Sequence, residues 1–113
     1  MTRQVIINNH AVGRPAPFVL FSGPCVIEDK QKTYDIAEFL KNVTQKLGIP
    51  YIFKASYDKA NRTSIDSFRG PGPAAGLDVL SAIRKDLGIA VMSDVHQVSE
   101  VAAAAEALDV IQI

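Results

Sequence analysis

Two lysines and a run of short polar donors stand together near the middle of the sequence. Lys54 ends an apolar stretch, Lys59 follows closely, and Asn61, Arg62 and Thr63 come next. A planar guanidinium, two ammonium groups, an amide and a hydroxyl are donors that proteins use to hold a phosphate group. The spacing therefore predicts a site for a phosphorylated molecule in this part of the chain.

These residues also have a simpler interpretation. Loop lysines are often solvated, and Asn61 and Thr63 could hydrogen-bond to their own backbone. A functional site is favoured by the length of residues 53–72, which connect an apolar run to a helical pattern, since connections this long within compact α/β domains are usually functional. Residues 69–72, Arg-Gly-Pro-Gly, are expected to shape the return of this loop.

Apolar runs and helical patterns alternate along the chain. Short apolar runs predict strands, and apolar residues spaced three or four positions apart predict helices between them. The predicted strands are 18–21, 49–53, 89–92 and 108–113, and the predicted helices are 30–47, 74–87 and a third helix marked by Val98, Val101, Ala102 and Ala105.

Punctuating residues support these boundaries. The carboxylate of Asp29 is a predicted cap for the first helix, and Gly48 and Gly88 are predicted helix ends because glycine adopts the left-handed conformation readily. Before the first buried strand, the weakly alternating residues 3–8 and the turn-forming residues after them predict a short N-terminal β-hairpin.

The alternation of strands and helices predicts a parallel sheet with right-handed crossovers. Polar residues gather just after the strands, as they do both in (β/α)₈ barrels and in open doubly wound sheets. The first strand is not followed by Gly-x-Gly-x-x-Gly, which disfavours a dinucleotide-binding sheet. The sequence stops on an apolar strand that would leave a sticky edge. We therefore expect an α/β chain in which residues 1–113 are one partial domain, the N-terminal half of a (β/α)₈ TIM barrel truncated after its fourth strand and preceded by the hairpin.

Composition narrows the class of partner. Twelve basic and twelve acidic side chains cancel, which argues against broad binding to nucleic acid or to an anionic membrane. No apolar run approaches the roughly 20 residues of a membrane span, and the first residues lack the pattern of a secretory signal. The single cysteine, Cys25, fits a reducing cytoplasmic setting.

The whole chain resembles the N-terminal half of the 3-deoxy-D-manno-octulosonate 8-phosphate synthases. The related 3-deoxy-D-arabino-heptulosonate 7-phosphate synthases share the barrel and a Gly-Pro-Cys turn but carry a Lys-Pro-Arg-Thr-Ser type loop, so Ala60-Asn61 before Arg62 favours the octulosonate enzymes. The segments that carry the resemblance are Gly23-Pro24-Cys25 with Glu28, and residues 53–56, 58–64, 68–72, 93–96 and 109–112.

This resemblance implies a cytoplasmic, homotetrameric transferase. It would condense phosphoenolpyruvate with D-arabinose 5-phosphate and water, releasing phosphate and a 3-deoxy sugar acid for lipopolysaccharide synthesis, without an organic cofactor. Two alternatives stay open: a heptulosonate 7-phosphate synthase of aromatic amino-acid synthesis, and a non-catalytic half-barrel that only binds phosphate esters.

The resemblance also implies roles for individual residues. Lys54 is expected near the carboxylate and phosphate of phosphoenolpyruvate, and Lys59 between the two substrates, where it would polarise the aldehyde or assist proton transfer. Asp94 is expected near the sugar hydroxyls, although a helix N-cap is its simpler interpretation. The implied catalytic residues are Lys54, Lys59 and Asp94, and the implied substrate-binding residues are Lys54, Ser56, Lys59, Asn61, Arg62, Thr63, Asp94 and Gln112.

Within that set, Asn61, Arg62 and Thr63 are implied to grip arabinose 5-phosphate, partly across a subunit interface, with Thr63 standing where serine is common. Gln112 is implied to face the phosphoenolpyruvate site, or else it is a polar interruption in an edge strand. His96 is interpreted as a rim or structural residue.

Cys25 sets the expected metal dependence. Members of the resembled family with cysteine here bind a divalent metal, such as zinc, iron or manganese, and those with asparagine work without one. The simpler interpretation of a lone cysteine is inert packing. The histidine, glutamate and aspartate that complete the family's site are expected beyond these 113 residues, so this segment alone is expected neither to hold the metal nor to be active.

Overall fold

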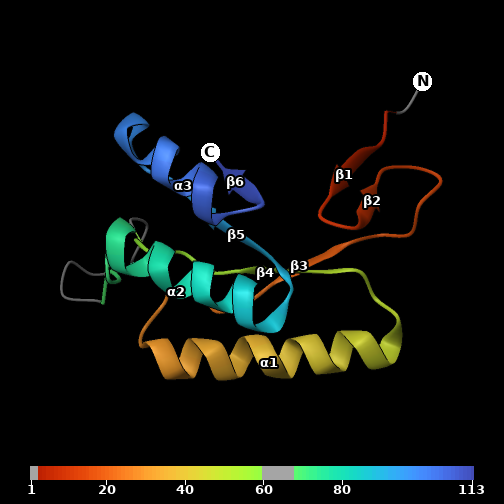
Figure 1. Ribbon diagram of the computed structural model, residues 1–113, viewed down its shortest axis with the longest axis horizontal. Helices are drawn as coiled ribbons and strands as arrows, with labels where there is room; N and C mark the ends of the chain where they lie inside the picture. Colours follow the sequence, from red (N-terminus) through yellow and green to blue (C-terminus); the bar gives the residue numbers. More distant parts are fainter. Residues whose placement is uncertain (1–2, 60–67) are drawn as a thin grey trace.

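The computed structural model describes residues 3–59 and 68–113 as a mixed α/β structure, in which the helices lie on one side of a parallel sheet (Figure 1). The elements in chain order are β1 (Val5–Ile7), β2 (His10–Val12), β3 (Leu20–Ser22), α1 (Lys30–Leu47), β4 (Tyr51–Lys54), α2 (Pro73–Leu87), β5 (Ala90–Asp94), the 3₁₀ helix η1 (Val98–Glu100), α3 (Val101–Ala107) and β6 (Val110–Gln112).

The main sheet has the strand order β3-β4-β5-β6, and all of its described strands run parallel. The predicted order of strands and helices and the parallel sheet are therefore confirmed. β1 and β2 pair antiparallel in a separate sheet, with Asn8 in the left-handed region at the turn. In Figure 1 this pair lies at the opposite end of the molecule from α3.

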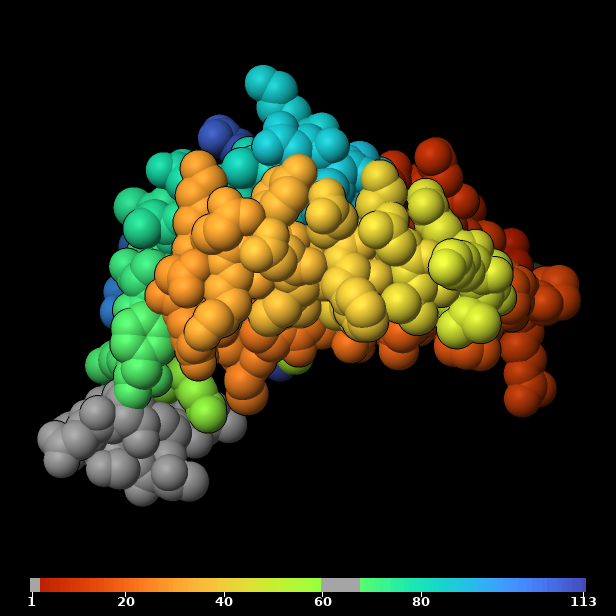
Figure 2. All heavy atoms as spheres, turned by 90° about the horizontal axis from the view of Figure 1, so that it is seen from below, coloured from red at the N-terminus to blue at the C-terminus, as the bar shows by residue number. Residues whose placement is uncertain are grey.

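One face of the main sheet is covered by helices. Alternate strand residues, including Tyr51, Phe53 and Val91, join a buried cluster with Leu80 and Ile83 of α2. α2 packs between α1 and α3. Seen from below, α1 runs across the molecule with its outer side uncovered (Figure 2). This cluster is the main hydrophobic core of the described residues.

The other face of the sheet has a smaller apolar cluster. Ile52, Ala90 and Met92 are buried there, with Val110 packed beside them and Ile7 of the hairpin against them. Since successive residues of a strand point to opposite faces, the residues next in line on this face, toward the carboxyl ends of the strands, belong to the polar positions discussed below.

Helix ends follow the predicted punctuation. The Asp29 carboxylate accepts a hydrogen bond from the backbone N–H of Lys32 at 2.7 Å, which satisfies one of the free amides of the first turn. Gly48 and Gly88 end α1 and α2 with φ of 67° and 65°. Pro73, rather than Ala74, begins α2, where the absence of an N–H costs nothing.

The third helix is present, but the residues that mark it in the sequence do not form its buried side. Val98 belongs to η1 and is 91% exposed, and Val101, Ala102 and Ala105 of α3 are also exposed. The residue of α3 that is fully buried is Ala104, which contributes to the core. Because alanine occupies most positions around this short helix, its spacing does not specify which side faces the sheet.

Candidate active site

A hollow of about 420 Å³ lies at the carboxyl ends of the strands, on the sheet face away from the helices. We call it the polar hollow. It brings together most of the described residues that the sequence singled out. It is lined by Phe21, Ser22, Gly23, Pro24, Cys25, Lys54, Ser56, Lys59, Asp94 and Gln112.

Strand register explains why three of these side chains share one wall. Lys54 is paired with Met92, Asp94 is two residues beyond Met92, and Asp94 is paired with Gln112. Residues paired in a parallel sheet, and residues two apart in a strand, point to the same face. Lys54, Asp94 and Gln112 therefore stand on one face, and each ends its own strand. Gln112 is therefore not only a polar interruption in an edge strand, because its side chain also lines this hollow.

A glycine allows the turn after β3 to reach the end of β4. A Cβ atom on Gly23 would lie 1.9 Å from the carbonyl oxygen of Lys54, so no other residue fits without a shift of the backbone. The close approach places Pro24 and Cys25 on the rim. Cys25 is exposed, so its thiol is not packed in the core of the described residues.

Ser56 holds the chain immediately after β4. Its hydroxyl donates to the carbonyl of Asp58 at 2.9 Å and accepts from the backbone N–H of Asp58 at 3.2 Å. Its own carbonyl accepts from the N–H of Ile27 at 2.9 Å. Ser56 is buried and lines the hollow, so its hydroxyl is already engaged in shaping the turn that leads to Lys59.

The two ends of the long loop are tied together. The Arg69 guanidinium makes two hydrogen bonds with the Asp58 carboxylate, at 2.6 and 3.2 Å, and the N–H of Lys59 donates to the carbonyl of Arg69 at 2.6 Å. The carboxylate of Asp58 raises the pKa of Arg69. Gly70 and Gly72 have φ of 124° and 88°, which confirms that the segment 69–72 shapes the loop's return.

Asn61, Arg62 and Thr63 lie outside the described residues, so their implied contacts with a sugar phosphate stay predictions. Lys59 is the last described residue before them, and it lines the polar hollow. The backbone hydrogen bond between Lys59 and Arg69 holds the described residues on either side of that segment together.

Asp94 has partners that the sequence did not reveal. Oδ2 of its carboxylate lies 3.2 Å from Nε2 of His96, and the Ser93 hydroxyl donates to its carbonyl at 3.0 Å. The residue that caps η1 is Gln97, so the interpretation of Asp94 as an N-cap is wrong. His96 does not line the hollow but contacts a residue that does, in keeping with its predicted structural role.

Sequence reasoning also missed Tyr57 and Glu100. The Tyr57 hydroxyl donates to Glu100 Oε1, and the ring of Tyr57 meets the edge of the His96 ring. A tyrosine three residues after a strand, followed by a charged residue, was the available signal. Its partner is distant in sequence, and only the packing of η1 beside the end of β4 joins them.

The described residues do not form a complete metal site. None of them belongs to a group of three or more histidine, cysteine, aspartate and glutamate side chains placed to hold an ion. Cys25 offers one exposed thiol at the edge of the polar hollow, and stable divalent sites need at least three protein ligands.

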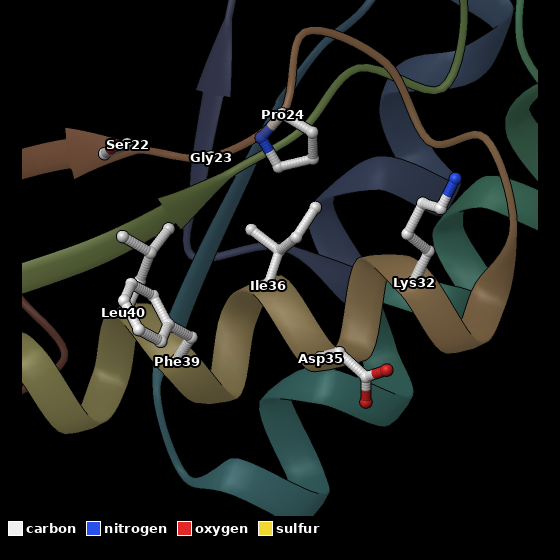
Figure 3. A pocket seen from close by; sticks show the side chains of 8 residues that line it. All are labelled: Ser22, Gly23, Pro24, Lys32, Asp35, Ile36, Phe39 and Leu40. Atoms are coloured by element: carbon white, nitrogen blue, oxygen red, sulfur yellow. The ribbon is translucent and has the colours of Figure 1, made fainter.

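A second hollow, of about 450 Å³, lies on the helix side of the same turn (Figure 3). We call it the apolar hollow. The side chains of Ile36 and Leu40 rise from α1 toward the strands, and Asp35 points away (Figure 3). Its lining comprises Ser22, Gly23, Pro24, Lys32, Asp35, Ile36, Phe39 and Leu40.

In the parts of the chain that the structure describes, helices with the length and apolar character needed to cross a bilayer are absent.

Comparison with known proteins agrees with the resemblance seen in the motifs. The chain is 55% identical over 112 residues to the 2-dehydro-3-deoxyphosphooctonate aldolase of Desulfosudis oleivorans, an alignment that covers 99% of this chain and 40% of the relative. The protein of the same name from Pelobacter propionicus is 51% identical over 113 residues, covering 100% of this chain and 42% of that relative. The protein of that name from Syntrophobacter fumaroxidans is 56% identical over 96 residues, or 85% of this chain and 33% of the relative.

The name of these relatives is a synonym of octulosonate 8-phosphate synthase, so the resemblance is confirmed. The chain spans about 40% of the length of the curated relatives it matches. Residues 3–113 match the family described as the DAHP synthetase I family. The parallel sheet and the residues at its carboxyl edge agree with this match, which covers nearly the whole chain. The chain therefore belongs to the DAHP synthetase I family.

Proposed function

We propose that the protein condenses phosphoenolpyruvate with D-arabinose 5-phosphate and water, giving 3-deoxy-D-manno-octulosonate 8-phosphate and inorganic phosphate. The names of the relatives support this choice of substrates. The observation that carries the proposal is the polar hollow, where Lys54, Lys59, Asp94 and Gln112 line one space at the carboxyl edge of a parallel sheet.

The charges of the hollow suit two phosphorylated substrates. Phosphoenolpyruvate carries a carboxylate and a phosphate, and arabinose 5-phosphate carries a second phosphate. Two ammonium groups, from Lys54 and Lys59, reach the same space. Ammonium groups in a confined site stabilise phosphate and carboxylate groups more strongly than they do in water.

Each wall residue then has a role in the reaction. Lys59 polarises the aldehyde oxygen of the sugar while C3 of the enol forms the new carbon–carbon bond. Water adds at C2, and inorganic phosphate leaves by cleavage of its bond to C2. Lys54 and Gln112 hold phosphoenolpyruvate, and Asp94 accepts hydrogen bonds from the sugar hydroxyls.

Ser56 contributes to substrate binding by lining the hollow and by shaping the turn from which Lys59 extends. Asn61, Arg62 and Thr63 grip the sugar phosphate, with Arg62 and the Thr63 hydroxyl acting at its phosphate end across a subunit interface of a homotetramer. The roles of these three residues are carried over from the resemblance alone.

The larger setting is part of the same proposal. We infer that the four parallel strands are the first half of a (β/α)₈ barrel that works in the cytoplasm and supplies lipopolysaccharide synthesis. The parallel order and the polar carboxyl edge support the barrel, and the free thiol supports a reducing compartment.

Phosphate release tests the reaction. The full-length gene product is incubated with phosphoenolpyruvate and either arabinose 5-phosphate or erythrose 4-phosphate, and inorganic phosphate is measured. Release that requires arabinose 5-phosphate is expected. Release only with erythrose 4-phosphate would identify a heptulosonate synthase, and binding of phosphate esters without turnover would identify a non-catalytic module.

We further propose that Cys25 supplies one thiolate ligand to a divalent metal, such as zinc, iron or manganese, with the other ligands outside the described residues. Its exposed position on the rim supports this. Thorough chelation of the full-length gene product is expected to abolish phosphate release, and added metal is expected to restore it. Full activity after chelation would refute the metal role and leave the proposed reaction intact.

A further inference from the structure

Tyr57 is a completely buried tyrosine beside the polar hollow, with 0% of its surface exposed. It follows β4, and Gly76 of α2 packs so tightly against it that a Cβ atom on Gly76 would lie 2.2 Å from Cβ of Tyr57. The ring is therefore held from behind by a helix. Burial, together with the hydrogen bond to Glu100, raises the pKa of Tyr57, so its hydroxyl remains a donor at all physiological pH values.

Glu100 connects this hydroxyl to the backbone beyond β5. Its Oε1 atom accepts from the Tyr57 hydroxyl and also from the backbone N–H of His96, the latter at 3.1 Å. One carboxylate oxygen thus ties the segment that carries His96 to the end of the neighbouring strand.

The ring of His96 is oriented by the same tyrosine. The two rings meet edge to face, with centroids 5.9 Å apart and planes at 86°. That orientation directs Nε2 of His96 to Oδ2 of Asp94, 3.2 Å away. Asp94 lines the polar hollow, whereas Tyr57, His96 and Glu100 are absent from its lining.

We propose that Tyr57 and Glu100 are positioning residues, which fix His96 and through it the carboxylate of Asp94 in the wall of the polar hollow. This inference rests on the proposed function. Catalytic groups work best when held within about 0.5 Å of their productive position, and a displacement of about 1 Å can reduce turnover by up to 100-fold. A carboxylate at the end of a strand, with its partner on the following loop, needs such a support.

The test uses the full-length gene product and the phosphate-release assay. Tyr57→Phe keeps the buried ring but removes its donor, and kcat is expected to fall about tenfold with the KM for phosphoenolpyruvate unchanged. Tyr34→Phe is the matched control: Tyr34 lies on α1, its hydroxyl has no partner among the described residues, and the variant is expected to keep wild-type kcat.

Two substitutions at Glu100 distinguish a positioning role from an effect on protein stability alone. Glu100→Gln retains an oxygen that accepts both hydrogen bonds, and it is expected to keep most of the activity. Glu100→Ala removes the acceptor and is expected to match the loss in Tyr57→Phe. If Tyr57→Phe fails to fold, the contrast between these two variants decides in its place.

A double-mutant cycle gives the sharpest readout. If Tyr57 acts through His96, the double variant Tyr57→Phe/His96→Ala loses no more kcat than His96→Ala alone, because the path is already broken. Losses in kcat that multiply, or a Tyr57→Phe variant that lowers only the urea midpoint and not kcat, would overturn the inference while leaving the proposed function standing. A wild-type protein that releases no phosphate with either sugar would overturn both.

Discussion

The two hollows share the turn Ser22–Pro24 but differ in chemistry. The polar hollow is lined by Lys54, Lys59 and Asp94 at the ends of strands. The apolar hollow is lined by aliphatic and aromatic side chains of α1, and its single lysine, Lys32, is largely exposed and paired with Glu28.

The difference follows from the pleat of the sheet. On the side toward the helices, strand residues are buried apolar groups that complete the core. On the other side, the apolar cluster occupies the strand interiors and gives way to charged residues at the carboxyl ends. A hollow that is larger and more apolar is therefore not the better candidate for chemistry here. Convergent charges from separate strands make the polar hollow the better candidate site.

The largest difference in activity between the two hollows is expected from lysine substitutions. Lys59→Ala in the full-length gene product is expected to lower kcat/KM for phosphate release about 1,000-fold, since it removes a positive charge from where negative charge develops. Lys32→Ala, the same substitution in the apolar hollow, is expected to stay within about twofold, since exposed surface ion pairs contribute little. Equal losses in the two variants would break the comparison.

Glycine substitutions test the shared turn. Gly23→Ala forces a methyl group against the carbonyl oxygen of Lys54, and we expect the free energy of unfolding to fall by about 3 kcal/mol. Gly88→Ala is the control, since its Cβ would meet nothing and only the positive φ is strained, for an expected loss of about 1 kcal/mol. Urea unfolding measures both; a Gly23→Ala variant as stable as Gly88→Ala would contradict the close approach.

Two buried tyrosines predict how stability changes at alkaline pH. Tyr51 donates to the carbonyl of Ser22 at 2.6 Å, and Tyr57 lies behind the polar hollow. Burial raises the pKa of both, and for Tyr57 the carboxylate of Glu100 adds to the shift. The folded state therefore favours the protonated phenols. Their contribution is fully present below the usual tyrosine pKa of about 10 and is lost as the pH rises from there toward the folded pKa.

Urea unfolding measured between about pH 8 and pH 11 checks this, because that range spans the usual tyrosine pKa of about 10. The free energy of unfolding should decline above pH 10, and the decline should be shallower in Tyr57→Phe and in Tyr51→Phe. A slope unchanged in both variants would show that neither phenol is responsible.

The smallest expected effect is on the outer side of the apolar hollow. Phe39 is 65% exposed, so Phe39→Ala should change the free energy of unfolding of this chain by less than about 0.5 kcal/mol. Ala37→Ser, two residues away but fully buried, serves as the contrast and should cost about 1–3 kcal/mol through an unsatisfied hydroxyl. A large loss for Phe39→Ala would mean that the exposed rim is packed.

Much of the fold could be predicted from the sequence. The order of strands and helices was predicted because buried parallel strands are short apolar runs and because Asp29, Gly48 and Gly88 mark helix ends by local chemistry. The face of α3 was not, since a helix rich in alanine has no distinct apolar side. The sequence pattern did not indicate which residue of α3 would be buried, and packing into the main core decided that it is Ala104.

Part of the candidate site could likewise be predicted from the sequence, and part could not. Lys54, Lys59, Asp94 and Cys25 were singled out from their types and places after strands, because the carboxyl ends of parallel strands gather at one edge. Gln112 was singled out by the resemblance alone. The support behind Asp94 could not be foreseen, because Tyr57, His96 and Glu100 interact only after strands have paired.

The sequence by itself determined the element order, the helix caps and the family, since these depend on residues close together along the chain or on matched motifs. Only the tertiary structure decided that Lys54, Asp94 and Gln112 share a wall, that Gly23 must be glycine, and that Tyr57 meets Glu100. The physical reason is that strand register and helix packing are long-range choices, which set distances between residues that local patterns leave undefined.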